Sequence, residues 1–146
     1  MPSPSKSGGE GADSMTQLLL HLWGDYILQS DWMAKGKTIW WLPCLLHVTL
    51  YSLPFLLVGA TWRAFVVIFA THYLIDRYRL ARFLTFAKNW EPKKPQFWKT
   101  GPIQWYPLVT STGYPTENPA WLAVWLLIIA DNILHLTINF LALKYL

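Results

Sequence analysis

The sequence predicts an all-α membrane protein, a four-transmembrane-helix bundle with a long Pro/Trp-rich loop between helices 3 and 4. Of the 146 residues, 53% are hydrophobic and only 14% are charged, whereas soluble domains average about 25% charged residues. The hydrophobic residues gather in four segments, and a helix needs roughly 20 such residues to cross a bilayer. We therefore expect one transmembrane domain, residues 15–146, with helices over about 15–34, 38–59, 61–84 and 119–143.

Boundary residues support the first two helices. Ser14 followed by Gln17 fits a capping box at the start of the first helix, and Gly36 suits the position just after its end. Trp40 and Trp41 open the second helix, and tryptophan at such a position is typical of the membrane interface. Both segments therefore have recognisable ends as well as an apolar interior.

The third and fourth helices differ in length. The third is apolar only as far as Asp76, so it is short for a membrane span, and we expect it to continue into the interface as a basic amphipathic helix. The fourth is the cleanest apolar segment, with Asn118 as its cap and Pro119 in its first turn. Asp131 then falls near the middle of a membrane span.

Two stretches lie outside the predicted helices. Residues 1–14 are small and polar, which predicts a disordered tail. Residues 88–118 form a loop rich in proline, tryptophan and tyrosine, and loops of this length are usually functional or disordered. The aromatic content favours a segment that covers the helix bundle at the interface.

The positive charges predict the orientation. Most of the 12 lysines and arginines lie in residues 35–37 and 77–118, and positively charged loops remain on the cytoplasmic side. We therefore expect these two loops to be cytoplasmic and both termini external. The basic residues adjoin apolar spans instead of lining a polar face, so we expect the lipid bilayer and not nucleic acid as partner.

All four histidines lie inside apolar segments, and three of them have an aspartate four residues away. Residues four apart share one face of a helix, and ionisable groups in a membrane-length segment are costly unless they pair or bind something. The sequence therefore predicts one shared polar centre, built from His21/Asp25, His72/Asp76, Asp131/His135 and the remaining histidine, His47.

Histidine and carboxylate side chains are the usual ligands of zinc, manganese or iron. We expect a divalent metal ion, and a bound ion could activate water to hydrolyse a lipid-linked or membrane substrate. His47 and Asp76 would serve as a further ligand or the general base. The predicted metal ligands are His21, Asp25, His72, Asp131 and His135.

Two other interpretations of the same pairs stay open. Histidine and aspartate chains also form proton relays, which would make this a proton-conducting or phage-encoded membrane-interaction protein, acting as a homo-oligomer because of its few spans. Alternatively, the pairs hydrogen-bond across helices and only hold the bundle together, at perhaps 1 kcal/mol each.

Three sequence blocks resemble a known family. HLWGDYILQSDWMAKGK (His21 to Lys37), THYLIDRYRLARF (Thr71 to Phe83) and DNILHLTINFLAL (Asp131 to Leu143) are similar to domain-of-unknown-function family 3307. The resemblance covers residues 15–146 and implies a small multispan protein of the bacterial inner membrane, often encoded by phage. The polar positions that match are His21, Gly24, Asp25, Gln29, Lys37, His47, His72, Asp76, Asp131 and His135.

That family resemblance implies no activity. In having histidines and aspartates within apolar segments, the chain is also loosely similar to proteins labelled membrane-bound metal-dependent hydrolases. No substrate is transferred from that second similarity.

Overall fold

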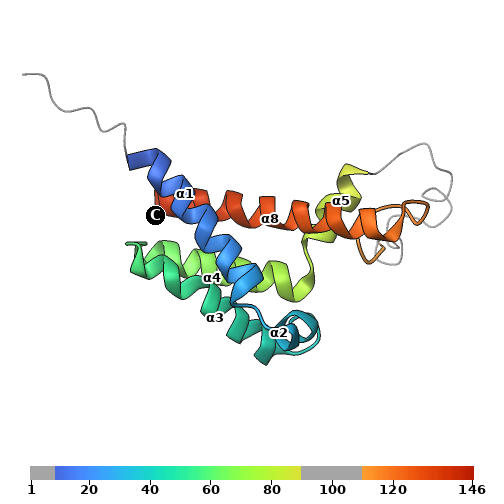
Figure 1. Ribbon diagram of the computed structural model, residues 1–146, viewed down its shortest axis with the longest axis horizontal. Helices are drawn as coiled ribbons and strands as arrows, with labels where there is room; N and C mark the ends of the chain where they lie inside the picture. Colours follow the sequence, from blue (N-terminus) through green and yellow to red (C-terminus); the bar gives the residue numbers. More distant parts are fainter. Residues whose placement is uncertain (1–8, 90–109) are drawn as a thin grey trace, which may run out of the picture. The chain divides into compact units, whose positions relative to one another are not determined.

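The described residues, 9–89 and 110–146 of a computed structural model, contain six α-helices, one π-helical turn and no strand (Figure 1). An all-helical fold is therefore confirmed. The elements, in chain order, are α1 (Gly9–Leu22), the π-helix η1 (Trp23–Ile27), α2 (Asp31–Gly36), α3 (Trp41–Leu57), α4 (Trp62–Tyr78), α5 (Ala81–Lys88) and α8 (Ala120–Tyr145).

The chain separates into two compact units. Unit 1 comprises residues 1–78 and 135–146, and unit 2 comprises residues 79–134. Helix α8 (Ala120–Tyr145) contributes its first part to unit 2 and its last part to unit 1.

The structure does not support four membrane-spanning helices. Among the described residues, only α8 is long and apolar enough to cross a membrane, and α3 is an apolar helix of 17 residues. The predicted helix 15–34 is interrupted, because the chain passes from α1 through the π-helical turn η1 and starts α2 anew at Ser30. The Ser30 hydroxyl accepts a hydrogen bond from the Met33 backbone N–H at 3.3 Å, which caps α2.

The predicted helix 61–84 is also divided. Arg79 has φ 52°, a left-handed conformation that ends α4 before α5 begins at Ala81. At the N-terminus, residues 9–14 belong to α1, while the rest of the predicted disordered tail lies outside the described residues. The sequence signals located the helices but not these breaks, because a π-turn and a left-handed arginine leave the hydrophobic pattern intact.

Helix α3 is the centre of unit 1. It contacts α1, η1, α2 and, most extensively, α4, and Figure 1 shows α3 and α4 running side by side. A small hydrophobic cluster joins α3 and α4 to the last part of α8. Its buried members are Tyr51, Phe55, Ala64, Ile68 and Ala142.

A glycine permits the close approach of η1 to α3. A Cβ atom added to Gly24 would lie 2.3 Å from Cδ2 of Tyr51, far inside van der Waals contact. Any larger residue at position 24 would therefore push Tyr51 away. The next residue along the chain is Asp25, so the close packing of Gly24 against Tyr51 also determines the position of Asp25 beside α3.

In unit 2, residues 110–115 pack against α5. The Thr85 hydroxyl donates a hydrogen bond to the Thr112 carbonyl at 2.6 Å, and Tyr114 is buried. Gly113 has φ 76°, and an added Cβ would collide with the Arg82 carbonyl oxygen at 2.1 Å. Most of the predicted Pro/Trp-rich loop, residues 90–109, lies outside the described residues, so its role as a cover stays a prediction.

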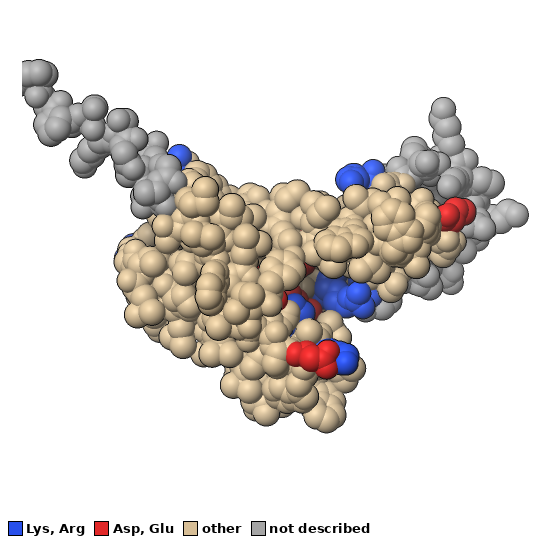
Figure 2. Space-filling view, viewed as in Figure 1, with Lys and Arg blue, Asp and Glu red and all other residues tan. Residues whose placement is uncertain are grey.

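Unit 1 buries several polar side chains beside its hydrophobic cluster and exposes many apolar ones. Gln17, His47, His72 and Asn139 are buried, whereas α3 contains no Asp, Glu, Lys or Arg and exposes apolar side chains along its whole length. Figure 2 shows few charged residues over α1 and α3. The exposed side chains of α3 are Trp41, Leu42, Leu46, Leu50, Leu53 and Leu57.

Candidate metal centre

The buried histidines and aspartates of unit 1 converge from several helices. His21 lies in the last turn of α1 and Asp25 in η1. His47 lies on α3 and His135 on α8. Helix α4 carries both His72 and Asp76. Six of the seven residues expected in a shared centre therefore lie in unit 1, and the seventh, Asp131, does not.

Two imidazole nitrogens meet at the middle of this centre. His47 Nε2 and His72 Nε2 are 3.0 Å apart. Asp25 Oδ1 lies 3.4 Å from the first nitrogen and 3.5 Å from the second. Asp76 Oδ2 lies 3.1 Å and 3.3 Å from the same two nitrogens. A carboxylate oxygen from each aspartate therefore contacts both histidines of the pair.

Asp76 extends the centre to a third histidine. Its second oxygen, Oδ1, lies 3.6 Å from His135 Nε2, and the rings of His72 and His135 are stacked with centroids 4.0 Å apart. The Asp76 side chain is only 3% exposed, and each of its oxygens lies near at least one buried histidine. One aspartate thus contacts three histidines.

The geometry satisfies the basic requirement of a metal site. Asp25, His47 and His72 form one group, and His72, Asp76 and His135 form another, each with ligand atoms within 4.8 Å of one another. Each group offers two imidazoles and one carboxylate, a donor set that zinc and non-haem iron use. Ligands on a tetrahedral zinc ion lie about 3.3 Å apart at ordinary bond lengths.

One buried atom supports this fit. Asp25 Oδ1 has no hydrogen-bond partner within the described part of the chain, although it lies beside the two histidine nitrogens at 3.4 and 3.5 Å. A buried carboxylate oxygen without a hydrogen bond is costly. A cation bound between this oxygen and the two nitrogens would give the oxygen a partner and would replace the hydrogen bond that joins the two nitrogens.

A second layer of polar residues surrounds the first group. The Tyr51 hydroxyl lies 2.8 Å from His21 Nδ1 and accepts a hydrogen bond from Asn139 Nδ2 at 2.6 Å. His21 Nδ1 is also 3.5 Å from Asp25 Oδ2. The Tyr51 ring contacts the His72 ring at a tilt of 37°, with centroids 3.8 Å apart. Tyr51 thus holds residues on both sides of the centre.

Gln17, one turn before His21 on α1, hydrogen-bonds to the backbone of α8. Gln17 Nε2 donates a hydrogen bond to the Leu136 carbonyl at 2.7 Å. Leu136 follows His135 directly, so this bond fixes the turn of α8 that carries the histidine. Helix α1 therefore contacts α8 through Gln17 as well as carrying His21.

The predicted metal ligands are not all in the two groups. Asp25, His72 and His135 are, whereas His21 touches the centre through Asp25 and Tyr51. Asp131 belongs to unit 2 and to neither group. His47 and Asp76, expected as a further ligand or the base, are both group members.

Sequence reasoning did not assign three residues that shape the centre. Tyr51 and Asn139 were visible as i+4 neighbours of His47 and His135, and that spacing was the signal that could have included them. Lys37, which reaches Asp76 Oδ2 at 2.9 Å, follows a short loop helix. Its position depends on how that loop folds back, which no local pattern reports.

The fold and site define an all-helical protein with a buried histidine and aspartate centre. A family model described as "Protein of unknown function (DUF3307)" matches residues 14–146, so the chain belongs to this family, as its sequence blocks indicated. No curated protein and no solved structure matches the chain.

The second layer can be tested through Tyr51. Tyr51→Phe removes the buried hydroxyl that contacts His21 and Asn139, and it leaves the Asn139 side chain without its acceptor. We expect the free energy of unfolding to fall by about 1–3 kcal/mol, measured by denaturant unfolding of the purified protein. Tyr145→Phe is the control, because Tyr145 is 69% exposed. Equal stability of the two variants would show that Tyr51 holds nothing in place.

Proposed function

We propose that this protein binds a divalent transition-metal ion, zinc, manganese or iron, at its buried histidine and aspartate centre. The observation that carries the proposal is the pair of Nε2 atoms 3.0 Å apart on His47 and His72. Both nitrogens face oxygens of Asp25, on η1, and of Asp76, one turn after His72 on α4. Imidazole nitrogens that lie close together and are flanked by carboxylates are an arrangement that suits a cation.

Charge compensation supports the same proposal. Asp25 and Asp76 are 11% and 3% exposed, and a buried carboxylate is strongly destabilising unless a positive charge or hydrogen bonds offset it. Lys37 supplies one positive charge at Asp76. A divalent cation at the two histidines would compensate Asp25, and on binding Asp76 as well it would take the place of Lys37 there.

We further propose a hydrolytic reaction on a lipid-linked or membrane substrate. A divalent ion in such a site supplies Lewis acidity near neutral pH. His47 or Asp76, whichever does not bind the ion, would accept the proton of the attacking water. The water oxygen would then bond to the ester centre as the bond to the leaving alcohol breaks, and the proton would pass to that alcohol.

The distribution of apolar side chains favours a membrane setting. Helix α8 has the length and composition of a membrane span, and α3 exposes apolar residues along its length, with Leu57 87% exposed. Water solvates such a surface poorly, whereas lipid chains cover it without cost. We propose an integral protein of the bacterial inner membrane, with a homo-oligomer as one arrangement. The predicted orientation, with both termini external and residues 35–37 and 77–118 cytoplasmic, needs four crossings, and among the described residues only α8 has the length of one.

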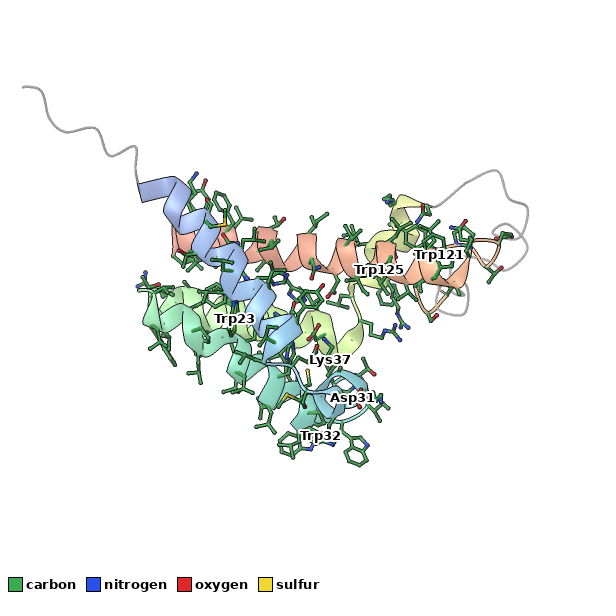
Figure 3. The ribbon with its side chains drawn as sticks, viewed as in Figure 1. Trp23, Asp31, Trp32, Lys37, Trp121 and Trp125 are labelled. Atoms are coloured by element: carbon green, nitrogen blue, oxygen red, sulfur yellow. The ribbon has the colours of Figure 1, made fainter. Side chains whose placement is uncertain are left out.

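Exposed tryptophans agree with an interfacial arrangement. Trp40 and Trp41 are 64% and 63% exposed at the start of α3, and Trp62 is 68% exposed at the start of α4. Figure 3 shows Trp121 and Trp125 near the start of α8. Tryptophan is enriched where lipid headgroups meet the hydrocarbon core, so these positions suit the ends of membrane-embedded helices.

Membrane integration predicts resistance to alkaline extraction. Membranes from cells that express the full chain should retain it in the pellet after a carbonate wash, because the apolar surface of α3 and α8 remains in lipid. The measurement is the fraction of the protein in pellet and supernatant. Release of most of the protein, as for a peripheral control protein, would contradict the membrane proposal.

Metal content tests the central proposal. The protein purified in detergent should carry close to one zinc, manganese or iron ion per chain by elemental analysis. His72→Ala should lower this content at least about tenfold, because His72 belongs to both groups. Asp76→Asn should do the same if the ion binds in the group that contains Asp76. Asp31→Asn is the matched control, since Asp31 is 78% exposed and pairs only with Lys35 at the surface.

Absence of metal from the unmodified protein, even after incubation with these ions, would overturn the proposal and favour the proton relay. Equal metal content in His72→Ala and Asp31→Asn would place the ion elsewhere, because His72 belongs to both groups.

A further inference from the structure

Lys37 contacts the same carboxylate oxygen that faces the two histidines. Its ammonium nitrogen lies 2.9 Å from Asp76 Oδ2 and 3.5 Å from Gln29 Oε1. That oxygen is also 3.1 Å from His47 Nε2 and 3.3 Å from His72 Nε2. The ammonium group therefore sits at the edge of the proposed metal centre.

The loop that carries Lys37 is fastened in place. The Lys37 N–H donates to the Met33 carbonyl at 2.8 Å, so Lys37 closes α2. Arg77 at the end of α4 then donates hydrogen bonds to the carbonyls of Thr38 and Ile39, the latter at 3.1 Å. The backbone on both sides of Lys37 is thus held, which directs its side chain toward Asp76.

Lys35, two residues earlier, offers a direct comparison. Its ammonium lies 2.8 Å from Asp31 Oδ2, but both side chains are nearly fully solvated, at 77% and 78% exposed. Lys37 is 20% exposed and its partner 3%. Figure 3 shows Asp31 and Trp32 on the outer side of α2, with Lys37 nearer the end of α1. Only the second pair is buried enough for its charge to matter strongly.

An ammonium group and a divalent ion on the same buried oxygen repel each other. Their charges would lie only a few ångströms apart in a site that water screens poorly, so the repulsion is large. Displacing the ammonium removes the repulsion, and the stem of a lysine allows this because it is long and flexible. The partly exposed position of Lys37 lets its charge move into solvent.

We propose that Lys37 is a built-in competitor that sets the metal affinity and selectivity of the centre. The proposal rests on the metal function proposed above. Without metal, the ammonium of Lys37 occupies Asp76; a divalent ion displaces it, while a monovalent ion gains too little from the carboxylates to do so. Lys37 therefore determines which cations enter and at what concentration.

Zinc titration of the purified full chain tests this role. Lys37→Gln should tighten zinc binding by about tenfold or more, because no cation then competes for Asp76. Lys37→Arg keeps the charge and should bind zinc close to the unmodified protein. Lys35→Gln is the matched control and should stay within about twofold, since surface pairs contribute little.

Chemical labelling of the unmodified protein gives a second readout that needs no variant. An amine-reactive reagent should label Lys37 slowly without zinc and several-fold faster with zinc, whereas Lys35 should react at the same rate in both states. Mass spectrometry of the fragments separates the two lysines.

The outcomes separate the two proposals. Zinc binding by the unmodified protein with unchanged or weaker binding in Lys37→Gln, or unchanged labelling of Lys37, would overturn the role of Lys37 alone. If Lys37→Gln does not fold, the labelling result decides. No binding by any variant of zinc, or of manganese or iron titrated in the same way, would overturn the metal function on which the role depends.

Discussion

Two carboxylates buried among apolar helices are the constraint on which unit 1 depends. The side chains of Asp25 and Asp76 are only 11% and 3% exposed, so water solvates them little and the protein must surround each with groups that offset its charge. The four histidines and Lys37 do this from α1, α3, α4, α8 and the loop after α2. Each of these elements therefore contributes a polar residue as well as apolar packing.

This constraint explains several backbone features. The π-helical turn η1 carries Asp25 and places buried Gly24 against Tyr51, and π-turns occur often at functional sites. Arg77 hydrogen-bonds to backbone carbonyls of the loop after α2, and in this loop conformation Lys37 reaches Asp76. Irregular segments, in this unit, position charges that regular helices would leave out of reach.

Much of the centre was predictable from sequence, because i+4 spacing on apolar helices is a local signal. The clustering of Asp25, His72 and His135 follows from it. The interruption of the first helix does not, since a π-turn leaves the pattern of apolar residues unchanged. The sequence also does not predict that Asp131 is in neither group. The i+4 spacing of Asp131 and His135 is the same whether or not the two residues belong to one unit.

The central claim is that nitrogen atoms of these histidines and oxygen atoms of these aspartates bind one metal ion. X-ray absorption at the zinc edge of the zinc-loaded protein tests it most directly. The account predicts only nitrogen and oxygen ligands near 2.0–2.2 Å, with the scattering pattern of at least two imidazoles. A sulfur ligand near 2.3 Å, which only cysteine or methionine supplies, or a shell of oxygen atoms without imidazole would contradict it.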